Sequence, residues 1–201
     1  IERKVKTVTQ ELPRDFETTL RRAKRIYKQK RGDPDYLYSW HAPEVECISK
    51  GKARAPYEFG VKVSIATNLR TSGEKGKHFI VHTKAIHGRP YDGHTLKKAG
   101  ENIEKIIGRL PERFLVDKGY KGHKWEEPRT KVFQSGQKRG VTPAIKRDIK
   151  RRSVIEPIIG HAKNEGLLRR NYLKGRKGDE INAILASIGF NFRQITAVLA
   201  A

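Results

Sequence analysis

Alternating apolar and polar residues in the first half of the chain predict a β-hairpin. In the stretch 57–67 the apolar residues fall at every second position from Phe59 to Ile65, as in a strand with one buried face. A second run of strand-forming residues covers 78–86, and the short segment between the two runs contains glycines. We therefore expect the two runs to pair as neighbouring strands.

Apolar residues at helical spacing appear in the second half of the chain. The stretch 95–109 has apolar residues three and four positions apart and ends before Pro111. A further helix is expected from about Pro143 into the 150s, and a final one over 180–199. We expect the apolar stripe of this last helix to face the core: Ile181, Ile184, Leu185, Ile188 and Phe192.

Two shorter apolar runs, 113–117 and 130–133, predict additional strands. The elements then follow one another as helical segment, strand, strand, helix, strand, strand and helices. This order is typical of an α/β protein, and we expect the strands to form a central sheet.

The beginning of the chain has a different character. Residues 1–31 are charged and rich in helix formers, and we expect Pro13 to divide them into two helices. Residues 36–55 show no period and are expected to be irregular. We therefore divide the chain into a basic helical segment, 1–35, which is an insertion or linker, and a domain at 36–201.

Charge favours a polyanionic partner. The 201 residues include 44 Lys and Arg against 22 Asp and Glu, a net charge of +22. Nucleic acid is the first candidate, and the alternatives are a basic surface without a partner or a ribosomal-type binder. Cys47 is the only cysteine, which excludes an internal disulfide and fits a reducing compartment.

No apolar run approaches the roughly 18 residues of a membrane span, so we expect no membrane partner and a cytoplasmic location. Met is absent from the sequence, position 1 included. We expect on this ground that residues upstream of Ile1 are missing.

Asp117 is the first candidate for chemistry. It follows the buried run Phe114-Leu-Val and precedes Gly119, so its carboxylate is held at a strand end beside a residue that permits close approach. The alternative is an Asp that only caps the turn. Carboxylate oxygens are the ligands that Mg²⁺ prefers.

Glu156 is the second candidate, and it has a structural alternative. Ser153 and Glu156 have the spacing of a capping box, in which the Glu reaches back to the start of its own helix. However, Arg152 lies four residues before Glu156 and Lys163 seven after it. On a continuous helix both cations would share a face with Glu156, as at a site that holds metal against phosphate.

Further residues surround these two. Asp92 and His94 form a polar pair between a predicted strand and helix, where a turn or capping role is the main alternative to metal binding. The excess of cations near both carboxylates favours a phosphate backbone, although a solvated helix face remains the alternative. The candidates for DNA binding are Lys118, Lys121, Lys150, Arg151, Arg152 and Lys163.

Several motifs together resemble a known family. Arg152, Glu156 and Lys163 form the pattern Arg-x3-Glu-x6-Lys. It is accompanied by Leu115-Val-Asp-Lys-Gly-Tyr120, Pro90-Tyr-Asp-Gly-His94, Ile155-Glu-Pro-Ile-Ile-Gly-His161 and Gly189-Phe-Asn-Phe-Arg193. From about Asp33 to its end, the chain resembles the C-terminal part of the catalytic domain of DDE transposases of bacterial insertion sequences. Members usually carry a Tyr three positions before the Arg, where this chain has Ile149.

The resemblance implies an RNase H-like mixed sheet with flanking helices, whose first strand and first catalytic Asp lie upstream of Ile1. It implies that Asp117 and Glu156 are catalytic ligands that share two Mg²⁺ or Mn²⁺ ions with that Asp. Arg152 and Lys163 would position double-stranded DNA, namely the element ends and the target.

The implied activity is metal-dependent DNA cleavage and strand transfer in transposition. We expect a homodimer for the full-length protein and no activity for this chain alone. The alternatives are a non-catalytic basic DNA-binding remnant and a nuclease of the same fold.

Overall fold

The computed structural model describes residues 14–50, 53–54, 56–70 and 76–200. These residues form a mixed α/β structure, as the order of elements predicts, but not the single central sheet that we expected. The described strands make three separate two-stranded sheets. The predicted division of the N-terminal helices at Pro13 lies outside the described residues.

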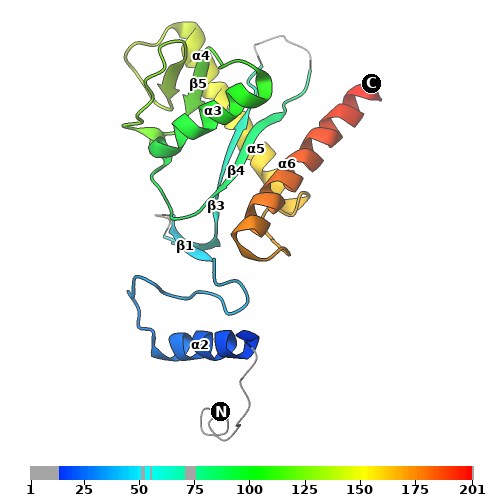
Figure 1. The fold of residues 1–201 in the computed structure, drawn as a ribbon. Helices are drawn as coiled ribbons and strands as arrows, with labels where there is room; N and C mark the ends of the chain where they lie inside the picture. Colours follow the sequence, from blue (N-terminus) through cyan, green and yellow to red (C-terminus); the bar gives the residue numbers. More distant parts are fainter. Residues whose placement is uncertain (1–13, 51–52, 55, 71–75, 201) are drawn as a thin grey trace, which may run out of the picture.

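The first helix of the described chain stands apart from the rest. Helix α2, Arg14–Lys28, lies at one end of the molecule and is joined to it by a long extended segment (Figure 1). The side chain of Gln29 holds the start of this segment, because it accepts a hydrogen bond from Leu37 N and donates one to Leu37 O, at 2.9 and 3.1 Å.

The prediction that residues 36–55 are irregular is wrong at one place. Strand β1, Glu46–Ser49, pairs antiparallel with β2, Tyr57–Gly60. The strand escaped notice because its four residues are too few to show a period. The stretch 57–67 is also two strands, since Gly60, with φ of 142°, breaks it in a conformation that favours glycine.

The predicted hairpin is confirmed. Strand β3, Lys62–Thr67, pairs antiparallel with β4, Ile80–Ile86. The start of the outer edge of β4 is occupied by a side chain, because the Asn191 side-chain amide accepts a hydrogen bond from Ile80 N and donates one to Ile80 O, at 2.8 and 2.9 Å. At this residue the backbone groups are therefore not free to pair with another strand.

A third sheet lies beside the hairpin. Strand β5, Arg113–Val116, and β6, Lys131–Gln134, are parallel and confirm both short-strand predictions. The helix predicted over 95–109 is α3, Leu96–Ile107, and a short 3₁₀ turn, η1, Asp92–Thr95, leads into it. Ala66 and Val81 of the hairpin pack against a cluster contributed by α3 and β5: Leu96, Ile103, Phe114 and Val116.

The helical run predicted from Pro143 is continuous but changes character twice. It consists of α4, Pro143–Arg151, the 3₁₀ turn η3, Arg152–Val154, and α5, Ile155–Asn164. The capping box is not formed, because Ser153 lies inside this run and its hydroxyl donates to Lys150 O at 3.0 Å. Arg152, Glu156 and Lys163 therefore belong to one helical run, as the site hypothesis requires.

Helix α6, Gly175–Leu199, starts earlier than predicted. It buries a different face from the one that we expected to meet the core. The stripe expected to face the core is exposed, and its members are 39 to 62% accessible. The residues buried against the hairpin and α5 are small or lie between the stripe positions: Ala183, Ala186, Ser187 and Phe190. Small side chains let the helix approach β4 closely, Phe190 is the large residue that packs inward, and the large residues of the expected stripe point outward.

Candidate DNA-binding and carboxylate site

A large cavity separates the hairpin from the third sheet. Its volume is about 1550 Å³, and it is lined by the whole of β3 and the whole of β5. Residues of α3 and α5 also line it, for example Leu96 and Ile159. Among the described strands β3 pairs only with β4, and β5 only with β6, so each presents one unpaired edge. We call this space the β3–β5 cavity.

Asp117 lies where β5 ends, and it lines the β3–β5 cavity. Its Oδ1 accepts a hydrogen bond from Gly119 N at 2.8 Å, which fixes the carboxylate at the start of the 3₁₀ turn η2, Lys118–Tyr120. Asp117 therefore caps the turn, as the alternative interpretation of this residue requires. One carboxylate oxygen accepts several hydrogen bonds, however, so the cap and a ligand role are compatible.

Asp92 lies beside Asp117. A Cβ added to Gly119 would come within 2.8 Å of Asp92 Oδ2 and 3.0 Å of Asp117 Oδ1, so the two carboxylates flank this glycine closely. Any larger residue at position 119 would push them apart. Turn η1 and turn η2 thus bring together two carboxylates that are distant in the sequence.

Two further residues complete this cluster. The Lys62 ammonium donates to Asp92 Oδ1 and to Pro90 O, both at 2.8 Å, and so compensates part of the negative charge. Burial raises the pKa of Tyr120, and the Asp92 and Asp117 carboxylates raise it further. The Tyr120 hydroxyl consequently stays neutral and keeps its proton for donation.

The predicted signature divides between the cavity, where both of its cations lie, and the surface, where its carboxylate lies. Arg152 and Lys163 line the β3–β5 cavity together with Asp117 and Asp92. Glu156 does not belong to the lining residues. Its side chain is 69% exposed and pairs with Arg152, Oε1 to Nη2, at 3.7 Å. The structure thus places Glu156 next to the cavity-lining Arg152 but on the solvent side of α5.

The other sequence-predicted site residues lie outside the lining of the β3–β5 cavity. Lys118, Lys121 and Lys150 are exposed. Arg151 is half-buried and has a structural role, because its guanidinium donates to Arg70 O and to Asp148 Oδ1 at 3.4 and 3.5 Å. His94 packs edge-on against the Tyr91 ring, 5.6 Å between centroids, and lines a small separate pocket with Lys97 and Lys124.

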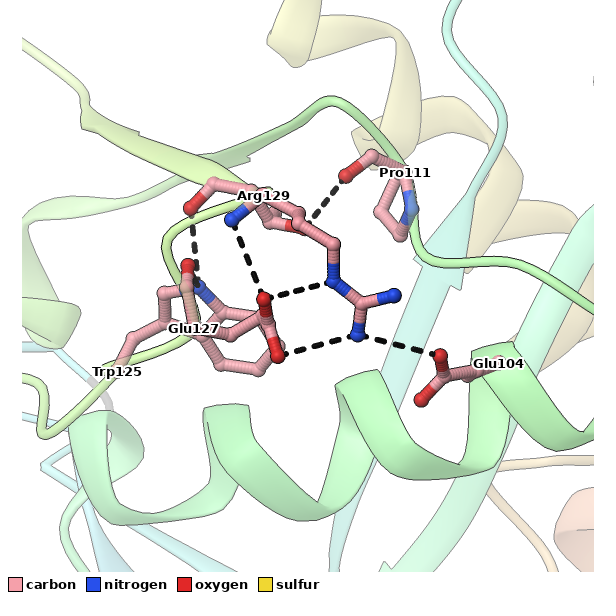
Figure 2. A network of polar contacts seen from close by, with 6 residues as sticks. Glu104, Pro111, Trp125, Glu127 and Arg129 are labelled. Atoms are coloured by element: carbon pink, nitrogen blue, oxygen red, sulfur yellow. Dashed lines mark hydrogen bonds and ion pairs between the residues drawn. The ribbon is translucent and has the colours of Figure 1, made fainter.

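A polar network holds the loop that follows Asp117 (Figure 2). The Arg129 guanidinium bonds both carboxylate oxygens of Glu127, at 2.8 and 3.1 Å, and lies 3.6 Å from Glu104 of α3. The Trp125 indole N–H donates to Glu127 O and Thr130 O. These contacts anchor the loop to α3 and fix the position of Trp125.

Trp125 in turn supports β5. Its ring meets Phe114 edge to face, with centroids 5.1 Å apart, and presses so close to α3 that Gly100 has no room for a side chain. The strand that carries Asp117 at its end is therefore braced from one side. From the sequence, Trp125 could stack on bases or pack within the protein, with packing favoured, and in the structure it packs against Phe114 and Gly100.

The described residues offer few ligands for a divalent cation. Among them, no group of three or more His, Cys, Asp or Glu side chains is arranged to hold a metal ion. Mg²⁺, however, is usually bound through one or two carboxylates, with phosphate and water as the remaining ligands. Asp92 and Asp117 supply such a pair.

Lys62 and Tyr120 were not identified from the sequence as site residues. Lys62 opens β3 and reaches Asp92, 30 positions away. Its position in an alternating strand gives no signal of this contact. Tyr120 belongs to the motif around Asp117, and that motif was the one available signal.

Comparisons with known proteins return no relative. No family model matches the chain, and neither the curated proteins nor the solved structures include a match. Within the described part of the chain, every helix is too short or too polar to cross a membrane.

Proposed function

We propose that this chain belongs to the catalytic domain of a DDE transposase and acts in metal-dependent cleavage and strand transfer of DNA. One observation carries the proposal: Asp117 ends β5 at a cavity bordered by two unpaired strand edges and lined by Arg152 and Lys163. A carboxylate, a second carboxylate at Asp92 and two cations thus surround one space, in a chain with a net charge of +22.

The β3–β5 cavity supports the proposal of an RNase H-like sheet in which one strand, between β3 and β5, is not supplied by the described residues. A strand between β3 and β5 would pair with both edges, and its side chains would alternate between the α3 side and the α5 side. Buried on both faces, it would need to be apolar throughout. If it runs parallel to β5, its carboxyl end reaches the same edge of the sheet as Asp117.

This position corresponds to the first, central strand of the family that the motifs resemble. That strand ends in the first catalytic Asp, which would then lie near Asp117. With this strand in place, the hairpin and the β5–β6 pair become one mixed sheet. The described residues supply no strand for the position, which agrees with their division into separate sheets.

We propose the following roles. Asp117 is a metal ligand, with Asp92 as its neighbour. Glu156, which pairs with Arg152 outside the cavity, would have to leave this pair to reach the site. Bound Mg²⁺ or Mn²⁺ supplies charge stabilisation at the phosphate and an activated oxygen nucleophile. Arg152 and Lys163 hold the phosphate backbone through charge-assisted contacts that carry no sequence information.

A non-catalytic DNA-binding remnant is the second candidate, and one observation favours it. The Glu156 carboxylate is exposed and paired with Arg152 and does not line the cavity that holds Asp117. In that case the basic surface alone would account for function, with affinity that depends on salt but not on metal.

A cleavage assay separates the two. The chain, with any residues that precede it in its reading frame, is incubated with supercoiled plasmid DNA with and without Mg²⁺. We expect nicking or linearisation only with Mg²⁺ or Mn²⁺, lost in Asp117→Asn and in Glu156→Gln while DNA binding stays at the wild-type level. Glu101→Gln, an exposed carboxylate on α3 outside the cavity, is the matched control and should cleave normally.

If wild-type protein binds DNA but does not cut it with either metal, the remnant is the better interpretation. Cleavage by both variants at the wild-type rate would exclude the two carboxylates from the reaction.

A further inference from the structure

The outer face of helix α6 is an apolar surface without a partner in the described chain. Eight large apolar side chains along it are at least 39% exposed, and Leu199 reaches 81%. They are Ile181, Ile184, Leu185, Ile188, Phe192, Ile195, Val198 and Leu199. We call this surface the α6 stripe. Figure 1 shows α6 along the outer side of the molecule, with its C-terminal half projecting away from the sheets.

The opposite face of α6 is already occupied. Phe190 packs with Ile80 of β4 and Ile158 of α5, and the Asn191 amide is bonded to the edge of β4. Ala183 and Ala186 are almost completely buried. Because the helix is held through these residues, it cannot turn the α6 stripe inward without losing the contacts of its other face.

The spacing of the α6 stripe follows a seven-residue repeat. Leu185, Phe192 and Leu199 are seven residues apart, and so are Ile181, Ile188 and Ile195. The two sets alternate at intervals of four and three residues. This is the pattern by which two helices pack along a shared seam, with each side chain inserted between side chains of the facing helix.

The charges around the α6 stripe admit a second copy of this chain. Each copy carries a net charge of +22, so most of its surface repels another copy. From Ile181 to Leu199, however, Arg193 is the only charged residue. The positions that flank the seam on one side are uncharged or small, namely Asn182, Gly189 and Thr196. A cation-free face is also unsuited to DNA.

The exposed area is at the upper end of what a monomer shows and approaches what a stable dimer needs. Seven of the eight residues are aliphatic, so at about 150 Å² for a fully exposed side chain, the low end of the aromatic range, the α6 stripe exposes on the order of 600 Å². A standard interface buries roughly 800 Å² on each partner, whereas the largest apolar patch on an ordinary monomer is roughly 300–600 Å².

We infer that the α6 stripe is the interface of a homodimer in which α6 of one copy packs against α6 of a second copy across a two-fold axis. Such an interface uses the same surface on both copies, so one apolar seam satisfies both partners. The inference does not rest on the proposed function, since no carboxylate or DNA contact enters it.

The test is the mass of the protein in solution. The chain, treated with nuclease and kept in about 0.5 M salt so that DNA cannot bridge copies, is measured by light scattering after gel filtration. We expect twice the 23.0 kDa of one chain for the wild type. Ile188→Glu places a charge in the seam at an exposed position and should give 23.0 kDa with an unchanged circular dichroism spectrum.

The matched control is Ile106→Glu on α3, which is 70% exposed and lies outside the α6 stripe. It should leave the dimer intact. A monomeric wild type, a dimer that survives Ile188→Glu, or a dimer lost equally in Ile106→Glu would each overturn the inference. If Ile188→Glu fails to fold, Leu185→Lys, at a more exposed position of the same seam, gives the same test.

Discussion

His82 is expected to make the protein sensitive to mild acid. The side chain lies in β4 and only 4% of the residue is exposed. Burial, and to a smaller extent the nearby Lys84, lowers its pKa from 6.5 to about 4. The folded protein therefore holds a neutral imidazole at pH 5, where the unfolded chain would already be protonated.

The sign and the size of the effect follow from this difference. Because the pKa of His82 is lower in the folded state, its contribution to stability is constant above about pH 6.5 and is lost as the pH falls from there to about 4. One pKa unit corresponds to about 1.4 kcal/mol. The loss from this one group is thus roughly 2 to 3 kcal/mol by pH 4.5 and approaches about 3 to 4 kcal/mol well below pH 4.

The perturbation that isolates this group is His82→Leu. In the described structure His82 Nε2 is buried without a hydrogen-bond partner, so an apolar side chain of similar size removes no bond. Urea unfolding is measured at pH 7.0 and pH 4.5 for both proteins. Between these two values the wild type should lose roughly 2 to 3 kcal/mol more than the variant.

His41→Leu, at an exposed histidine, is the matched control and should lose as much stability as the wild type. Parallel losses in the wild type and in His82→Leu would show that the imidazole is not held neutral by burial, and the reasoning would fail.

Two other substitutions test the packing and the charge. Gly100→Ala would bring a Cβ within 2.4 Å of the Trp125 ring, so we expect a loss of about 1–3 kcal/mol in thermal or urea unfolding. Gly160→Ala, where a Cβ meets nothing within 4 Å, should be neutral or stabilising, and an equal loss in both would contradict the packing. Lys163→Gln should lower the slope of log affinity for duplex DNA against log salt by about 1 without changing the melting temperature; an unchanged slope would place DNA elsewhere.

The fold shows what a period in the sequence can predict. Strong and local patterns, such as the β3–β4 hairpin and α3, were predicted correctly. The period of α6 correctly grouped the five residues of the expected stripe on one face, while Phe190 lies on the other. A period does not say which face meets a neighbour, however, and here Ala183 and Ala186 make the contact while Ile188 points outward.

The site shows a second limit. Asp117 was found because it ends a buried apolar run, a local signal. Its neighbour Asp92 could be named only as a weaker candidate, because the two meet through the packing of two short 3₁₀ turns around Gly119. Likewise the β3–β5 cavity depends on how the sheets are spaced, which no run of residues encodes locally.

Localised oxidative cleavage of the polypeptide tests most directly whether Asp117 holds a divalent cation. Fe²⁺ replaces Mg²⁺ in the presence of DNA, ascorbate and peroxide, and radicals formed at the metal cut the backbone close to its ligands. We predict cuts near Asp117 and near Asp92, suppressed by excess Mg²⁺ and absent in Asp117→Asn. Cuts spread over the chain, or cuts near Asp117 that persist in Asp117→Asn, would contradict a metal site at the end of β5.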